Sequence, residues 1–174
     1  NNTTIINPVY TPGPNDIANG SVTISLRAFG MAPCSDSVDS MILTINPEPT
    51  PVILGAIEVC EFEAGVIYST TNVIGNNYNW NVTGGTIVGG TGTNQITIDW
   101  GISGNGTITL IETIGATGCT DTAAVANITL HPLPTVLNVT GGGSYCAGGT
   151  GVNVGLFGSQ VDVSYQLQLN NIDF

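Results

Sequence analysis

The chain has 174 residues, of which 41% are hydrophobic and 7% charged, and twelve carboxylates against one basic side chain give it a net charge of -11. This charge argues against binding to nucleic acid and to anionic membrane surfaces, because phosphate backbones and anionic lipids are both held by clustered Lys and Arg. No segment approaches eighteen uninterrupted apolar residues, so membrane insertion is not expected either. The 24 glycines among many Thr, Asn and Ser residues are typical of short strands and turns, so almost no helix is expected.

An internal repeat of 85 or 86 positions organises the chain. Residues 32–49 and residues 117–134 share a cysteine, an aspartate followed by a hydroxyl residue, a β-rich run and closing prolines, in the same order and without a gap. The surroundings of Cys60 recur around Cys146. A period of this size indicates one small domain per repeat, with neighbouring domains stacked in series.

The repeat divides the chain into three predicted parts. Residues 1–47 are expected to be the C-terminal half of a β-sandwich repeat, residues 50–134 a complete repeat, and residues 135–174 the N-terminal part of a following one. Proline-rich joints separate them at residues 47–49 and 131–134. Because proline fixes φ and restricts the residue before it, these joints should be short, stiff and extended.

The complete repeat should contain seven short strands. In residues 65–72 and 77–83, bulky side chains alternate with polar ones, as expected when one face is buried and the other is wet. The predicted strands lie near residues 51–56, 65–72, 77–83, 85–88, 94–99, 106–114 and 121–130. Short strands separated by glycine-rich turns at this spacing predict an all-β fold of tandem immunoglobulin-like sandwiches.

Four cysteines accompany this pattern. Cys60 and Cys119 belong to the same complete repeat, and a disulfide between them would close a loop of about 60 residues and stabilise the fold by roughly 4 kcal/mol. Cys34 and Cys146 would then have their partners before Asn1 and after Phe174. The alternative is four reduced, buried thiols. A disulfide would indicate an extracellular setting.

Two tryptophans are predicted to have different roles. Trp80 lies in an alternating strand and is expected to fill the sandwich core close to the disulfide. Trp100 precedes Gly101 in a predicted turn, so it should be partly exposed. Together with Tyr78 it is the candidate for stacking on a sugar ring.

Three stretches of the chain resemble a known family. Residues 10–20, residues 78–85 (Tyr-Asn-Trp-Asn-Val-Thr-Gly-Gly) and residues 141–149 are similar to PKD-like, immunoglobulin-like repeats of giant Bacteroidota surface proteins, which include gliding-motility adhesins exported by type IX secretion. The resemblance implies a structural, adhesive or filamentous role at the bacterial cell surface. Its implied partners are neighbouring repeats of the same long chain, or further copies in a filament.

The residue inventory argues against an enzyme. The only histidine, His131, lies in a predicted joint, and the absence of lysine removes Schiff-base chemistry, phosphate-binding loops and Ser-Lys dyads. No cofactor is expected. The alternative function is a module for glycan or calcium binding within such an adhesin. Candidate calcium-binding carboxylates are Glu58, Glu61, Glu63, Asp36 and Asp39, although solvated acids without a metal are the favoured interpretation.

An aspartate followed by Ser or Thr and an apolar residue occurs three times and resembles the O-glycosylation signal of Bacteroidota. The hydroxyl residues are Ser37, Ser40 and Thr122. The alternative interpretation is that each aspartate only closes a turn through side-chain to backbone hydrogen bonds. An intact mass of natively produced protein distinguishes the two.

Overall fold

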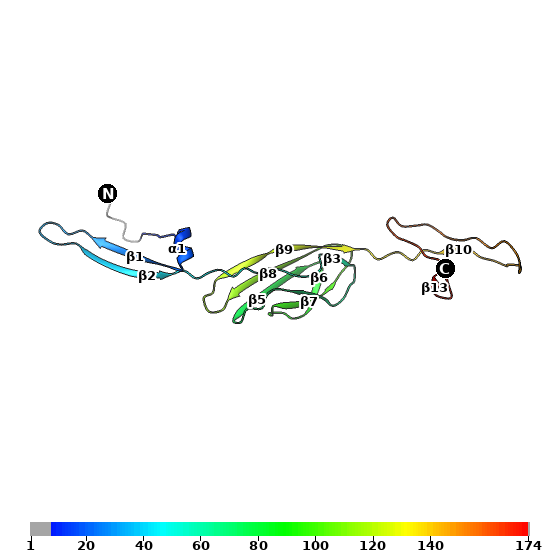
Figure 1. The fold of residues 1–174 in the computed structure, drawn as a ribbon, viewed down its shortest axis with the longest axis horizontal. Coiled ribbons are helices and arrows are strands. Elements are labelled where there is room, and N and C mark those ends of the chain that lie inside the picture. The colour runs from blue at the N-terminus through cyan, green and yellow to red at the C-terminus, as the bar shows by residue number, and fades with distance from the viewer. Residues whose placement is uncertain (1–7, 174) are drawn as a thin grey trace.

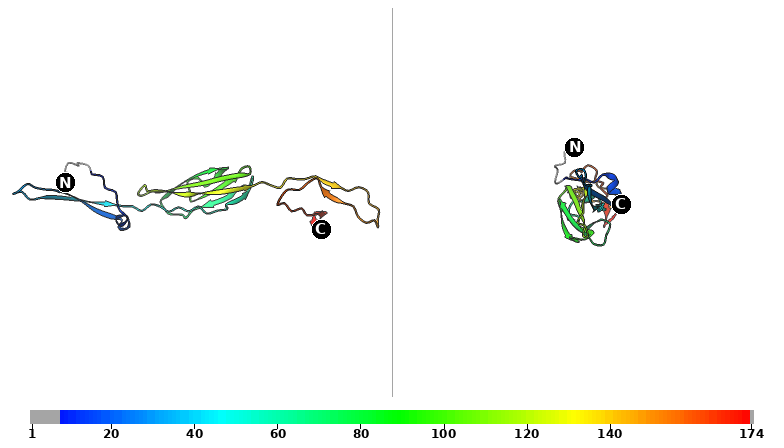
Figure 2. Two further views of the ribbon diagram at one scale, coloured as in Figure 1. Left: turned by 90° about the horizontal axis from the view of Figure 1, so that it is seen from above. Right: turned by 90° about the vertical axis from the view of Figure 1, so that its left-hand side faces the viewer.

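The computed structural model describes residues 8–173, except for the side chains of residues 124–126. An N-terminal hairpin, a central β-sandwich and a C-terminal segment follow one another along an extended axis (Figures 1 and 2). The prediction of a β-rich chain is confirmed, since helix α1 (Pro14–Asn19) is the only helix in the described part.

The N-terminal body consists of α1 and an antiparallel hairpin. Pro14 opens the helix where its missing N–H has no role, and Gly20 ends it in the left-handed conformation with a φ of 71°. Strand β1 (Ser21–Ala28) then pairs with β2 (Ser37–Thr44) along its whole length. One face of the hairpin is apolar except near the β1–β2 loop, where Asp39 and Ser37 lie opposite Leu26 and Ala28. It carries Val22, Ile24, Leu26, Met41 and Leu43.

The central domain is built from two sheets. The four-stranded sheet has the order β3-β9-β8-β5 and the three-stranded sheet the order β4-β7-β6. The strands are β3 (Glu58–Cys60), β4 (Val66–Ser69), β5 (Asn76–Thr83), β6 (Gly85–Gly89), β7 (Gln95–Trp100), β8 (Gly104–Ile114) and β9 (Thr120–His131). All pairs are antiparallel except β3 with β9, which is parallel.

The inner faces of these sheets form one apolar core. The predicted alternation is confirmed in β5, where Tyr78 and Trp80 are buried while the intervening Asn residues are exposed. The buried apolar residues are Val59, Tyr68, Tyr78, Trp80, Ile96, Ile98, Trp100, Ile108, Leu110, Ala123, Ile128 and Leu130. Both sheets therefore contribute to a closed sandwich.

The first predicted strand differs from the structure. Residues 51–56 contain a single bridge, between Leu54 and Ser69, rather than a strand. The sheet is instead completed by β3, which sequence analysis missed. Strand β3 has three residues, too few for an alternating pattern, and its parallel pairing requires no adjacent turn that could mark it in the sequence.

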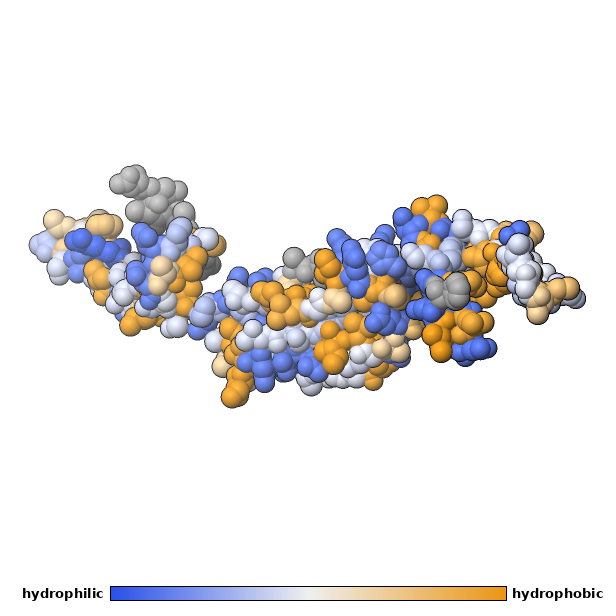
Figure 3. All heavy atoms as spheres, turned by 45° about the vertical axis from the view of Figure 1, so that its right-hand side comes forward, coloured by the Kyte–Doolittle hydropathy of each residue, from blue (hydrophilic) through white to orange (hydrophobic). Residues whose placement is uncertain are grey.

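The C-terminal segment contains two short antiparallel pairs and no closed core in its described residues. Strand β10 (Val139–Gly141) pairs with β11 (Val154–Leu156), and β12 (Gln168–Leu169) pairs with β13 (Ile172–Asp173). All ten residues of these strands are exposed. In the space-filling view hydrophobic residues lie on the surface of this segment (Figure 3).

Candidate functional site: the exit joint of the central domain

Strand β3 holds the point at which the chain leaves the central domain. It lies parallel to the last residues of β9, with Val59 opposite Leu130 and Cys60 opposite His131. Val59 is buried in the core and anchors the strand, whereas both neighbours in β3 are exposed. The residue after β3, Glu61, is thereby placed beside the exit joint, the residues that follow His131.

Glu61 fastens the joint to the domain with both carboxylate oxygens. Its Oε1 accepts a hydrogen bond from the backbone N–H of Leu133 at 2.9 Å, and its Oε2 accepts one from the N–H of Ser103 at 3.0 Å. Its own N–H donates to the carbonyl of His131 at 2.8 Å. These donors stabilise the ionised carboxylate, and they hold the pKa of Glu61 below its usual value, with the bond from Leu133 the largest cause.

The turn after Glu61 is also tied to the sandwich. Phe62 has a positive φ of 60° and donates its N–H to the carbonyl of Gly101 at 2.8 Å. The carbonyl of Glu63 accepts from the N–H of Trp100 at 2.8 Å, and the Glu63 carboxylate accepts from the N–H of Cys60 at 3.0 Å. The turn that holds the exit joint is therefore itself fixed to the sandwich by several hydrogen bonds.

The entry joint lies at the opposite end of the domain (Figure 1). Pro49 is buried, and with Glu48 and Thr50 it lines a hollow of about 290 Å³ against the start of β5 and the end of β8. Within this wall Glu112 is 3% exposed and accepts a hydrogen bond from the side-chain amide of Asn76 at 2.6 Å. The chain thus enters and leaves at opposite poles.

The predicted disulfide between Cys60 and Cys119 is wrong for this structure, in which all four cysteines are free thiols. Cys60 lies beside His131 at the last residue of β9, while Cys119 precedes its first residue. At about 3.3 Å per residue, the 12 residues of β9 separate the two thiols by roughly 35–40 Å. The repeat identifies equivalent positions in successive units, but it does not place two cysteines at the same pole.

Reduction should consequently leave the stability of the central domain unchanged. We expect thermal melts with and without a phosphine reductant to coincide, and we expect an alkylating reagent to label Cys60 and Cys119 of non-reduced protein after unfolding. A mass two hydrogens lower, with a cross-linked peptide containing both residues, would instead support the intradomain bridge.

Trp100 is buried, contrary to the prediction that it is exposed in a turn. It is the last residue of β7, is 3% exposed, and meets the ring of Tyr68 edge to face with 6.0 Å between centroids. It therefore cannot offer a stacking platform to a sugar. Tyr78 is buried as well, whereas the core position predicted for Trp80 is confirmed, and its indole N–H donates to the carbonyl of Thr93 at 2.8 Å.

The candidate glycosylation residues Ser37, Ser40 and Thr122 are all exposed on strands β2 and β9. The aspartates before Ser40 and Thr122 each accept a hydrogen bond from the N–H of that hydroxyl residue, at 2.9 and 2.7 Å. Such bonds fit the alternative, in which Asp shapes the local backbone, and they use the backbone N–H groups rather than the hydroxyls. Glycosylation stays a prediction.

The carboxylates considered for calcium do not converge. Glu61 and Glu63 are engaged by backbone N–H groups, and Glu58 lies 3.6 Å from the imidazole of His131, which ends β9 rather than lying in the joint. Among the described residues no group of three or more acidic, His or Cys side chains is arranged to hold a metal. Calcium binding at these residues therefore has no structural support.

One known protein family matches the central part of the chain. The family model of the PKD-like domain matches residues 46–128, which contain the entry joint and the sandwich up to Ile128 near the end of β9. The predicted PKD-like character is thereby confirmed for this stretch, together with a β-sandwich fold. No curated protein matches the chain. Within the described residues no helix has the length and apolar character needed to span a bilayer.

Proposed function

We propose that this chain is a structural segment of a secreted bacterial surface adhesin or filament, in which PKD-like sandwiches in series carry an adhesive end away from the cell. One observation carries the proposal: the chain enters and leaves the central domain at opposite poles, and Glu61 fastens the exit joint. Domains connected in this way extend a protein by their own length rather than folding back on each other.

The match to PKD-like domains supports an extracellular role, since these domains are often structural or adhesive modules outside the cell. In this proposal residues 1–47, 50–134 and 135–174 belong to three successive repeats of a gliding-motility type adhesin, a substrate of type IX secretion. The partners are neighbouring repeats or further copies. The chain has no catalytic role, and its exposed Ser37, Ser40 and Thr122 hydroxyls are available to a glycosyltransferase.

Surface exposure on the source cell tests the proposal. Antibodies raised against the central domain should label intact, non-permeabilised cells, and brief protease treatment of those cells should remove the signal. A cytoplasmic protein probed in parallel should resist both treatments. Labelling that requires permeabilisation would contradict the surface location, and with it the adhesive role.

A further inference from the structure

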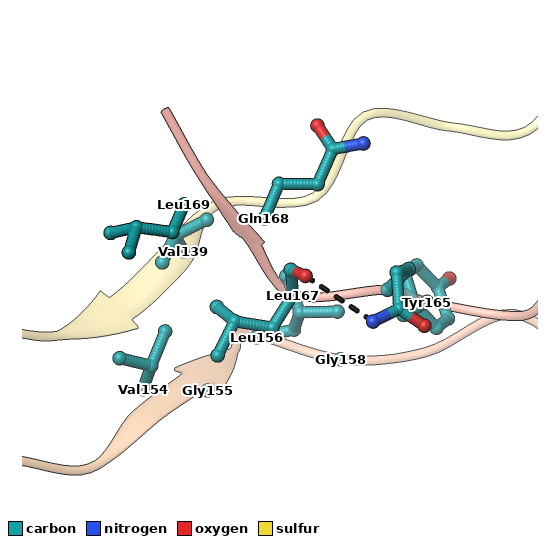
Figure 4. Close-up of a pocket in the computed structure, with 10 residues that line it drawn as sticks. Val139, Val154, Gly155, Leu156, Gly158, Tyr165, Leu167, Gln168 and Leu169 are labelled. Carbon is teal, nitrogen blue, oxygen red and sulfur yellow. Dashed lines mark hydrogen bonds between the residues drawn. The ribbon is translucent and has the colours of Figure 1, made fainter. Parts of the chain in front are cut away.

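The hollow at the entry joint has polar walls, unlike the larger hollow of the C-terminal segment. The C-terminal hollow, of about 920 Å³, is lined mainly by apolar side chains of β10, β11 and residues 165–169, and none of the residues that line it is charged (Figure 4). The entry hollow, of about 290 Å³, is lined by two carboxylates, Glu48 and Glu112, together with Asn76 and three threonines. Walls that consist largely of oxygen donors suit a small cation rather than an apolar ligand.

Glu112 is placed in the entry hollow by the alternation of β8. Ile108 and Leu110 point into the sandwich core, and Glu112 continues the same face at the entry end of the strand, where it is 3% exposed. Its Oε1 accepts the hydrogen bond from the side-chain amide of Asn76 at 2.6 Å, whereas its Oε2 has no hydrogen-bond partner among the described residues. A carboxylate buried to this degree needs a further partner for its charge.

Thr70 contributes a second free oxygen. It continues the inward face of β4 after Tyr68 and is 5% exposed. Its backbone N–H and carbonyl are bonded to Asn94, but its hydroxyl has no hydrogen-bond partner among the described residues. In this part of the chain Nε1 of Trp100 is the only fully enclosed side-chain nitrogen or oxygen without a partner. The free oxygens of Thr70 and Glu112 are therefore not enclosed, and the hollow that both residues line is the open space that they face.

No basic side chain of the chain compensates the charge of Glu112. Arg27 is the only Lys or Arg in the sequence, and it pairs with Asp36 in the N-terminal body. His131 ends β9 at the opposite pole of the central domain. Glu48, which is exposed, adds a second carboxylate to the lining. A compensating positive charge therefore has to come from solution.

The repeat indicates that this polar set is specific to the central domain. At offsets of 86 and 87 positions each of three polar lining residues has an apolar counterpart. The pairs are Thr70 with Leu156, Asn76 with Val163, and Glu112 with Leu26. The offset of 87 is fixed by Tyr78 and Tyr165, whose hydroxyls each accept a hydrogen bond from the N–H five residues earlier. Polar residues at positions that elsewhere hold apolar ones cost stability, and such departures are expected at functional sites.

The donor set fits calcium. This ion takes about six to eight oxygen ligands from carboxylates, neutral oxygens and waters, in a geometry that tolerates irregular sites. Magnesium requires a nearly ideal octahedron, and zinc and copper prefer imidazole or sulfur, which the lining residues do not contain. The two carboxylates and the Thr70 hydroxyl provide part of a calcium shell, and waters in the hollow complete it.

We propose that the entry hollow is a calcium site in which Glu112 and Thr70 of the domain and Glu48 of the entry joint bind the ion. Asn76 holds the Glu112 carboxylate with Oε2 free for the metal. Because Glu48 belongs to the joint, the bound ion ties the joint to the domain, as Glu61 does at the exit. The choice of calcium rests on the extracellular role proposed above, and extracellular modules bind this ion with dissociation constants of about 10⁻⁴–10⁻³ M.

Calcium titration of the purified full chain, first dialysed against EDTA, tests the site. Tryptophan fluorescence follows the thermal melt of the central domain, which contains both tryptophans. At a calcium chloride concentration about ten times the dissociation constant, the melting temperature should rise by roughly 5–10 °C. Magnesium chloride at the same concentration is the control for screening of the net charge of -11, and it should give a clearly smaller rise.

Three substitutions assign the response to the hollow. Glu112→Gln keeps the shape and an oxygen for Asn76 but removes the charge, so it should abolish the calcium response and melt in EDTA no lower than the wild type. Thr70→Val removes the hydroxyl at similar volume and should weaken binding. Glu48→Gln changes an exposed residue, which keeps the test independent of folding, and should weaken binding roughly tenfold. Glu58→Gln, an exposed carboxylate of β3, is the matched control and should bind like the wild type.

Amide shifts in NMR spectra locate the ion. Calcium should move the amides of Glu48, Thr70, Asn76 and Glu112 and leave those around Glu61 in place. The proposal is overturned by a melt that calcium does not raise, by an equal rise with magnesium, by Glu112→Gln or Glu48→Gln binding as tightly as the wild type, or by shifts confined to the exit pole. Surface labelling of cells does not depend on calcium, so failure of this site and failure of the proposed adhesive role are distinguishable.

Discussion

Replacing Gly106 by alanine is expected to destabilise the central domain by roughly 1–3 kcal/mol, the usual cost of overpacking a well-filled core. A Cβ at this position would lie 2.4 Å from Cζ3 of Trp100 and 3.0 Å from the carbonyl oxygen of Thr83. Neither neighbour can move easily. The indole is held edge to face against Tyr68, and the carbonyl belongs to β5 of the same sheet.

Urea unfolding followed by tryptophan fluorescence measures this loss, because both tryptophans of the chain lie in the central domain and report on it alone. Gly89→Ala is the matched control, since its Cβ would have no neighbour closer than 3.8 Å and its φ is not in the left-handed region. It should change the free energy of unfolding by less than about 0.5 kcal/mol.

The steric origin can be separated from a backbone effect by a second substitution. In the Trp100→Leu background the indole is absent, and Gly106→Ala should cost clearly less than in the wild type. An equal cost in both backgrounds would contradict the packing explanation and would indicate that the glycine is needed for its backbone conformation.

These glycines explain why sequence analysis placed Trp100 incorrectly. Gly85 and Gly106 lie on different strands, and a Cβ at either one would come within 3.0 Å of the Trp100 ring. The missing side chains of these two glycines therefore leave the space that the Trp100 indole fills. In the sequence alone, the same glycines look only like turn residues. Close packing between strands depends on register, and register is not visible from local composition.

The elements that could be predicted are those with a local signature. The alternation in β5 directly specified which side chains are buried, and Gly84 correctly marked the break between β5 and β6. Strand β3 and the separation of Cys60 from Cys119 depend instead on a parallel pairing between residues about 70 positions apart along the chain. No periodicity within either strand carries that information.

Glu61 shows the same limit at the candidate site. In the sequence its carboxylate is one of three acids close to Cys60, a grouping that suggests calcium. The structure assigns it to two backbone N–H groups, from Ser103 and Leu133, which lie 42 and 72 positions away. A carboxylate that accepts from two backbone donors is satisfied without a cation, and the donors could not have been identified without the fold.

Replacing Glu61 by glutamine is expected to release the exit joint while leaving the core folded. The amide can accept a hydrogen bond through its oxygen only, and its NH₂ group would face a second backbone donor. Amide hydrogen exchange of Leu133 and Ser103 should accelerate strongly, because these N–H groups lose a charge-assisted partner. The N–H of Trp100, bonded to the carbonyl of Glu63, is the internal reference and should exchange at an unchanged rate.

A control variant and acid titration make this test specific. Glu58→Gln removes a neighbouring exposed carboxylate that lies 3.6 Å from the imidazole of His131, and it should leave exchange at Leu133 unchanged. In the wild type, the amide shifts of Leu133 and Ser103 should titrate together with a midpoint below the ordinary carboxyl pKa of 4.5, since both report the same proton. Separate midpoints, or one at or above 4.5, would contradict the shared carboxylate.

The lowered pKa also sets the direction of the pH dependence. A carboxyl whose pKa is lower in the folded state binds its proton more weakly there than in the unfolded chain, so its stabilising effect is complete above pH 4.5 and is lost as the pH falls through the lowered value. The joint should therefore be fastened at neutral pH and loosen as the pH falls through this lowered pKa. Small-angle scattering should record this as a shorter and more variable maximum dimension in acid, and Glu61→Gln should show the same change at neutral pH.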